Sequence, residues 1–146
     1  MSNQQIINLY FDCEFTGLHK NTTLISIGIT DDNGRCFYAE LTDYDDKQVD
    51  EWLQDNVIDN LSMGHITDSF NSQLENVNYC KGTMTQVVDA LDEWLSEYND
   101  YQIEIWSDCL SYNWVLFVDL YGTVFELPKN IYHIPFDICT LMKTLE

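Results

Sequence analysis

The 146-residue sequence carries 25 acidic and 6 basic side chains, which gives a net charge of −19. This acidity disfavours diffuse binding to phosphate backbones, which needs clustered Lys and Arg, and the longest apolar runs are too short to span a membrane. A chain of this length can form a core without disulfides or metals, so we expect a single domain over residues 1–146.

Five scattered cysteines include no C-x-x-C pair. Their odd number and wide spacing indicate neither a disulfide framework nor a zinc site. We therefore expect reduced, mostly buried thiols in a cytoplasmic protein that makes no membrane contact.

The first third of the chain predicts an antiparallel sheet followed by a helix. Ile6–Phe11 and Leu24–Thr30 are typical of strands, and the turn residues Asp31–Gly34 return the chain into a third strand, Arg35–Leu41. In Asp45–Ile58 the apolar residues recur at helical spacing, so we expect an amphipathic helix that covers the sheet.

The rest of the chain alternates between helices and a strand. Asp59–Lys81 is polar and patternless and is expected to be a loop, whereas Thr83–Tyr98 has the spacing of a second covering helix. Ile103–Trp106 predicts a short buried strand, and Leu110–Tyr121 a helix that ends at Gly122. Strands that precede helices in this order indicate an α/β fold.

The stretch FDCEFTGL, residues 11–18, places two carboxylates two residues apart after an apolar run. In a strand Asp12 and Glu14 share a face, near the carboxyl end where α/β proteins place their sites. Such a pair is favourable when it holds divalent cations, and two ions about 3.5–4 Å apart can drive phosphodiester hydrolysis. The alternative is that two acids merely end an edge strand.

Three segments carry a family resemblance. DCEFTGL is similar to the first motif of the DEDD 3′–5′ exonucleases, IEIWSDCLSYNWVLFVDLYG (103–122) resembles their second, and IPFDICTLMK (134–143) resembles the segment that leads to their third. The likeness is greatest to small exoribonucleases of the polyadenylate-specific RNase AS group, which includes phage members. It implies an RNase H-like, DnaQ-like α/β fold, with a mixed sheet flanked by helices and nucleotide removal from RNA 3′ ends.

The resemblance also implies roles for the first motif. Asp12 and Glu14 would be catalytic and would ligate Mg²⁺ or Mn²⁺. Phe15, Thr16 and Gly17 match positions near the end of the substrate, and the Phe15 ring would border a terminal nucleotide. A simple turn explains Thr16 and Gly17 equally well.

The second motif departs from the family pattern. Asn113 stands where the family has a metal-binding aspartate, and its helical spacing with Leu116 and Phe117 predicts that it points inward. An amide offers a carbonyl oxygen but no charge, so we expect metal to bind weakly or not at all. Asp108 is a candidate replacement ligand, and Asp119 is expected to be a solvated acid.

The third motif has no match. His133 and Asp137 are four residues apart, but Pro135 between them argues against a continuous helix. The resemblance therefore implies a C-terminally shortened exonuclease domain, or a natural C-terminus that extends beyond Glu146.

Two functions follow from these observations. The first is a degenerate, inactive exonuclease fold that acts by binding, as an acidic inhibitor whose stretches 43–46 and 50–59 contact a basic protein partner. The alternative is an active Mg²⁺- or Mn²⁺-dependent 3′–5′ exoribonuclease whose missing ligand comes from Asp108, a second subunit of a homodimer, or further chain. For a phage-encoded protein the expected location is the host cytoplasm.

Overall fold

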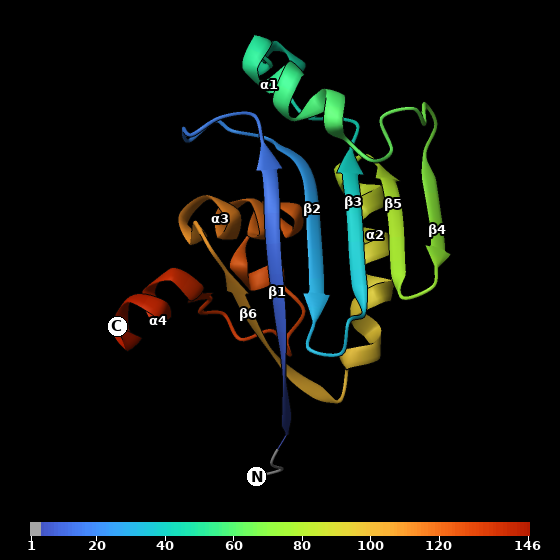
Figure 1. Cartoon of the computed structure of the whole chain (residues 1–146). Helices are drawn as coiled ribbons and strands as arrows, with labels where there is room; N and C mark the ends of the chain where they lie inside the picture. The colour runs from blue at the N-terminus through green and yellow to red at the C-terminus, as the bar shows by residue number, and fades with distance from the viewer. Residues whose placement is uncertain (1–3) are drawn as a thin grey trace.

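The computed structural model describes residues 4–146 and contains a seven-stranded mixed sheet (Figure 1). Its strand order is β4-β5-β3-β2-β1-β6-β7. The strands are β1 (Gln5–Phe15), β2 (Leu24–Asp31), β3 (Cys36–Leu41), β4 (Phe70–Leu74), β5 (Val77–Gly82), β6 (Tyr101–Ser107) and β7 (Phe136–Asp137). The α-helices are α1 (Glu51–Asn56), α2 (Met84–Leu95), α3 (Leu110–Tyr121) and α4 (Ile138–Leu145).

The sheet combines antiparallel and parallel pairs. β1–β2, β2–β3 and β4–β5 are antiparallel, whereas β1–β6, β3–β5 and β6–β7 are parallel. At least one helix lies between the two strands of each parallel pair along the chain, since parallel neighbours cannot be joined by a tight turn. The mixed α/β class expected from the sequence is confirmed, and the arrangement is compatible with an RNase H-like fold.

The main core lies on one face of the sheet. Phe11, Ile29 and Phe37 pair across β1, β2 and β3 and therefore point to the same side. The ring of Phe11 contacts Phe117 of α3, and that of Phe37 contacts Trp94 of α2, with centroids 5.4 and 5.9 Å apart. Helices α2 and α3 thus cover the same face, and the opposite face of the central strands is left without a helix (Figure 1).

The helix predicted over 45–58 is divided into three short turns. A 3₁₀ turn, η1 (Asp46–Gln48), precedes α1, and a second, η2 (Ile58–Asn60), follows it. Asp45 and Asp50 each accept a backbone N–H at the start of a turn, so each acts as an N-cap that begins a new element. Helix α1 packs Leu53 beyond the ends of β1 and β2 instead of covering a sheet face (Figure 1).

The prediction of a loop over residues 59–81 is wrong, because this segment contains most of the β4–β5 hairpin. Every side chain of β4 is exposed, so the strand lacks the apolar alternation that would reveal it. The hairpin is held at its turn, where the Asn76 side chain donates to the Gly34 carbonyl and the Asn76 carbonyl accepts from Cys36 N at 2.9 Å.

The two later helices form as predicted. Thr83 and Gln86 build a reciprocal capping box at the start of α2, and α3 ends at Gly122, whose φ of 95° favours glycine. None of the helices within residues 4–146 is long and apolar enough to cross a membrane.

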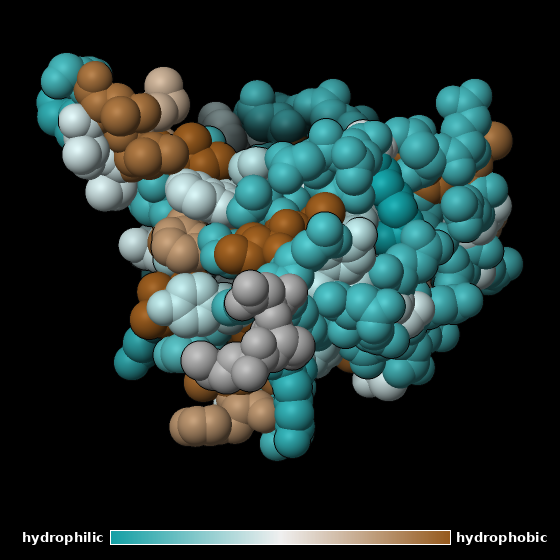
Figure 2. Space-filling view, turned by 90° about the horizontal axis from the view of Figure 1, so that it is seen from below, coloured by the Kyte–Doolittle hydropathy of each residue, from teal (hydrophilic) through white to brown (hydrophobic). Residues whose placement is uncertain are grey.

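All five cysteines are free, but the expectation that most are buried is wrong. Cys13 and Cys80 are buried, Cys36 is half-buried, and Cys109 and Cys139 are exposed. Cys109 precedes α3 and Cys139 lies on α4, and both side chains face solvent. Seen from below in Figure 2, the surface is largely hydrophilic, in keeping with the net charge.

Candidate functional site

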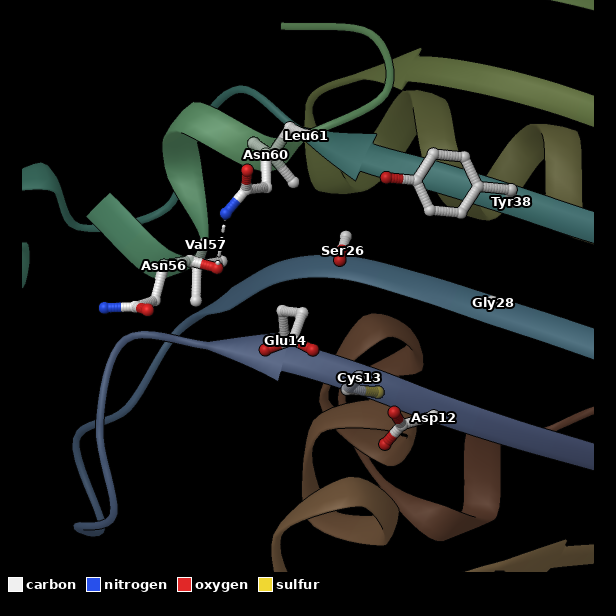
Figure 3. Close-up of a pocket in the computed structure, with 10 residues that line it drawn as sticks. All are labelled: Asp12, Cys13, Glu14, Ser26, Gly28, Tyr38, Asn56, Val57, Asn60 and Leu61. Carbon is white, nitrogen blue, oxygen red and sulfur yellow. Dashed lines mark hydrogen bonds between the residues drawn. The ribbon is translucent and has the colours of Figure 1, made fainter. Parts of the chain in front are cut away.

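Asp12 and Glu14 lie within the last part of β1, which extends four residues beyond the predicted end at Phe11. They share a face, with Gly28 and Ser26 of β2 as their register partners. Both border a cavity of about 320 Å³, whose other walls include Tyr38 and residues of the α1–η2 segment (Figure 3). One wall of the cavity is therefore formed by the sheet, and the opposite wall is formed by α1 and η2.

The two carboxylates repel each other. Partial desolvation, followed by the charge of Asp12, raises the pKa of Glu14 above its ordinary value. Glu14 accepts no hydrogen bond from any residue in the described range 4–146. Between them Cys13 points into the core, and burial raises the pKa of its thiol well above the ordinary value, so it is a neutral core group.

Asn113 is buried, as its helical spacing predicts, with 1% of its surface exposed. Its Nδ2, which has two hydrogens, donates to Ser107 Oγ at 2.8 Å and to the Asp108 carbonyl at 2.9 Å, and shares one of these hydrogens with Asp12 Oδ1 at 3.2 Å. Its Oδ1 is buried and has no partner. The second-motif helix and the end of β1 are thus brought together, as the resemblance implies.

The neighbours of Asn113 fix which way its amide faces. The Ser107 hydroxyl has a single hydrogen, which it gives to the Phe11 or Asp108 carbonyl, so it accepts from Asn113. The Asp108 carbonyl can only accept. Turning the amide over would set its oxygen against these acceptors, so Asn113 presents its amide nitrogen to Asp12 where a metal ligand would present an oxygen.

The other acids near the second and third motifs have different positions. The carboxylates of Asp108 and Asp119 are exposed, so the solvated position expected for Asp119 is confirmed. Asp137 is the N-cap of α4 and accepts from Thr140 N at 3.0 Å, so no single helix joins it to His133. The break expected at Pro135 is confirmed.

The expected substrate contacts differ in accessibility. The half-buried Phe15 ring stacks on Tyr112, with centroids 5.5 Å apart. The Thr16 hydroxyl donates to Gln48 Oε1 at 2.7 Å and accepts from Thr23 N, so it holds the 16–23 loop closed. A Cβ at Gly17 would come within 2.6 Å of Nε2 of the exposed His19 ring, so a larger residue there would have to displace that side chain.

Three cavity residues carry no sequence signal. Tyr38, Asn56 and Asn60 line the cavity opposite the carboxylates (Figure 3). The two asparagines donate to the Trp52, Asp55 and Asn56 carbonyls, which leaves their amide oxygens as the free groups. The position of α1 and η2 over the strand ends, which depends on tertiary packing, brings the two asparagines to this cavity.

A divalent cation fits this site only in part. Asp12 and Glu14 offer the hard oxygen ligands that Mg²⁺ and Mn²⁺ prefer, but Asn113 offers hydrogen-bond donors. Among residues 4–146, no three or more His, Cys, Asp or Glu side chains are grouped so that they could hold a metal ion. The two carboxylates, Asp12 and Glu14, therefore suit one weakly bound ion better than two ions.

The chain is similar to two 3′–5′ exoribonucleases. These are Rv2179c and MT2234.1 of Mycobacterium tuberculosis, from strains H37Rv and CDC 1551, each 27% identical over 122 residues. The aligned part covers 84% of this chain but spans only 66% of the length of each relative. No protein-family model matches the sequence.

Proposed function

We propose that this chain binds the 3′ end of RNA in the cavity beside Asp12 and Glu14 and does not hydrolyse it. The supporting observation is the amide nitrogen of Asn113, which makes one hydrogen bond of 3.2 Å to Asp12 from the position where the resembled motif has a metal-binding aspartate. The similarity to 3′–5′ exoribonucleases supports an RNA end as the ligand.

In this proposal the residues of the cavity bind and orient the RNA end. Asp12 and Glu14 would hold one Mg²⁺ or Mn²⁺ ion, which supplies positive charge for a phosphate. Asn113 keeps the Asp12 carboxylate in place, and the stacked rings of Phe15 and Tyr112, which are not among the residues that line the cavity, would border the terminal nucleotide. A base stacked on such rings contributes about 1–3 kcal/mol to binding.

The test is to measure binding and cleavage on the same RNA. A 5′-labelled single-stranded RNA is incubated with the protein in Mn²⁺, and complex formation and chain length are followed together. We expect a complex with intact RNA that is weakened when the 3′ hydroxyl is blocked by a phosphate. Phe15→Ala should weaken it at least about fivefold, because one stacking surface is removed.

The controls separate the two nuclease hypotheses. Phe125→Ala removes an exposed aromatic ring far along the chain and should not change RNA binding. EDTA-sensitive shortening of the RNA that is lost in Asp12→Asn would establish the alternative, an active 3′–5′ exoribonuclease. A complete lack of RNA binding in Mn²⁺ would contradict the proposal in both forms.

An acidic inhibitor that binds a basic protein is a second candidate. Glu51 and Asp55 of α1 are exposed beside Trp52, whose surface is 65% exposed, so acids and an aromatic ring share one protruding helix. Asp50 contributes to this surface but also caps α1 through Leu53 N at 2.8 Å. Such a surface favours fast, salt-sensitive association with a Lys- and Arg-lined groove.

The inhibitor hypothesis is tested with variants that preserve the cap. Asp50→Asn retains an N-cap side chain, and it can be combined with Glu51→Gln and Asp55→Asn. We expect the triple variant and high salt each to release a partner captured from the source cell or its host. A partner that is retained under both conditions would exclude this surface.

A further inference from the structure

Strand β4 is an open edge of the sheet. It pairs with β5 on one side only, and all five of its side chains are exposed. Its sequence, Phe-Asn-Ser-Gln-Leu, contains none of the charges or prolines that normally protect an edge strand from pairing. The opposite edge is different, because β7 has only two residues.

The two faces of β4 differ in character. Phe70, Ser72 and Leu74 have Lys81, Tyr79 and Val77 of β5 as their register partners and lie on the face that lacks a helix. Asn71 and Gln73 point to the other face. Phe70 and Leu74 are 38% and 65% exposed, so the strand presents two apolar side chains separated by a small polar one.

This strand is complementary to itself. When two copies run antiparallel with Ser72 opposite Ser72, Phe70 of one copy faces Leu74 of the other, twice, and Asn71 faces Gln73. Apolar side chains then lie opposite apolar side chains, and amides lie opposite amides. The strand can therefore pair with an identical copy of itself across a twofold axis. A register centred on Asn71 or Gln73 would instead set an apolar side chain opposite Ser72.

The acids that flank β4 also fit this register. Asp68 would lie near Asn76 of the second copy, and Glu75 near Ser69, so no carboxylate faces another across the pair. This spacing matters because each chain carries a net charge of −19. Like charges placed directly opposite each other would destabilise the pairing.

We propose that β4 is a homodimerisation edge, and that a second copy of this chain extends the sheet by antiparallel pairing centred on Ser72. The twofold axis is perpendicular to the sheet, so the Asp12–Glu14 sites of both copies open on the same side. The backbone ladder supplies the hydrogen bonds, and the two Phe70–Leu74 pairs supply the apolar contact.

The first test is sedimentation velocity from about 1 to about 200 µM protein, a range in which weak dimers become populated by mass action. We expect a monomer–dimer equilibrium whose Kd rises at least about tenfold in the double variant Phe70→Lys, Leu74→Lys. Phe125→Lys, which replaces a 91% exposed apolar side chain elsewhere, is the matched control and should leave the Kd unchanged.

Salt dependence gives a second readout. Added NaCl screens the repulsion between two acidic chains, so it should tighten the dimer. A strictly monomeric protein over the whole concentration range, or a dimer that ignores the double variant, would overturn the proposal.

Disulfide crosslinking tests the register itself. The variants are made in a background with Cys109→Ser and Cys139→Ser, which removes the exposed thiols. In this background Ser72→Cys should form a covalent dimer under mild oxidation, because the Cα atoms of opposite residues lie about 4.5–5.5 Å apart, within the range of a disulfide. Asn71→Cys alone should not, since it faces Gln73. Equal crosslinking by both single variants would contradict a register centred on Ser72. RNA binding is not needed for either experiment, so the dimer proposal can fail while the proposed function stands.

Discussion

The acids on the β1–β2 pair differ in how many hydrogen bonds their carboxylates accept. At one end Asp31 is buried and accepts three hydrogen bonds, from Asn33 N, Arg35 N and the Tyr98 hydroxyl, at 2.8, 2.9 and 2.7 Å. At the other end Asp12 accepts from Asn113, and Glu14 has no donor among residues 4–146. The two kinds of acid are close together in the sheet, because Asp31 pairs with Leu9 of β1, the strand that carries Asp12.

This difference separates Asp31, which has a structural role, from Asp12 and Glu14, to which we assign binding in the proposed function. Asp31 closes the β2–β3 turn and anchors Tyr98, and the Arg35 guanidinium stacks over the Tyr98 ring at 5.1 Å. Its hydrogen bonds compensate for the desolvation of a buried carboxylate. Asp12 accepts one hydrogen bond, Glu14 accepts none from residues 4–146, and both border the cavity, so these two acids keep free acceptor sites.

The largest effect is expected from Asp31→Ala. The substitution leaves the buried Tyr98 hydroxyl and two turn amides without their acceptor, so the free energy of unfolding should fall by about 3 kcal/mol. Urea denaturation measures this. The adjacent Asp32→Ala is the control, because Asp32 is exposed and should cost less than about 1 kcal/mol. Equal losses would remove the distinction between the two kinds of acid.

A smaller effect is expected from Asn113→Asp. The new carboxylate would face Asp12 and the Asp108 carbonyl in a buried position, so in EDTA the unfolding free energy should fall by about 2 kcal/mol. Mn²⁺ should restore much of this loss, because a cation can bridge the two acids. Asn99→Asp, at an exposed position outside the cavity, is the control. Wild-type stability of Asn113→Asp in EDTA would contradict the donor role of Asn113.

The smallest effect is expected from Glu14→Gln, measured in EDTA. Because the pKa of Glu14 is raised in the folded state, its contribution to stability is present below the ordinary glutamate value of 4.5 and is lost as pH rises through the folded pKa. The variant should therefore be more stable than wild type at pH 7, by less than about 1 kcal/mol. The difference should vanish near pH 4. A destabilised variant at pH 7 would show that Glu14 has a structural partner.

Sequence patterns predicted the elements that bury a regular apolar stripe. The bounds of α3 follow from the spacing of Leu116, Phe117 and Leu120 and from Gly122. The shared face of Asp12 and Glu14 follows from the period of a strand. These features depend on local geometry alone.

Features that depend on distant contacts were not predictable. Strand β4 buries no side chain, and its hairpin is fixed by Asn76 against Gly34, 42 residues away. The direction of the Asn113 amide depends on the Ser107 hydroxyl and the Asp108 carbonyl, which no spacing rule reveals. Whether an asparagine in this motif ligates or donates is therefore a tertiary property.

The most direct test of the account is the stoichiometry of Mn²⁺ binding, measured by calorimetry and by electron paramagnetic resonance. With Asn113 donating to Asp12, the wild-type chain should bind one Mn²⁺ with a Kd above about 10⁻⁴ M, as expected for a site with few charged ligands. Asp12→Asn should abolish this binding, and Asn113→Asp should strengthen it. Two tightly bound ions per wild-type chain, lost together in Asp12→Asn, would contradict the central claim that the Asn113 amide has replaced a metal ligand.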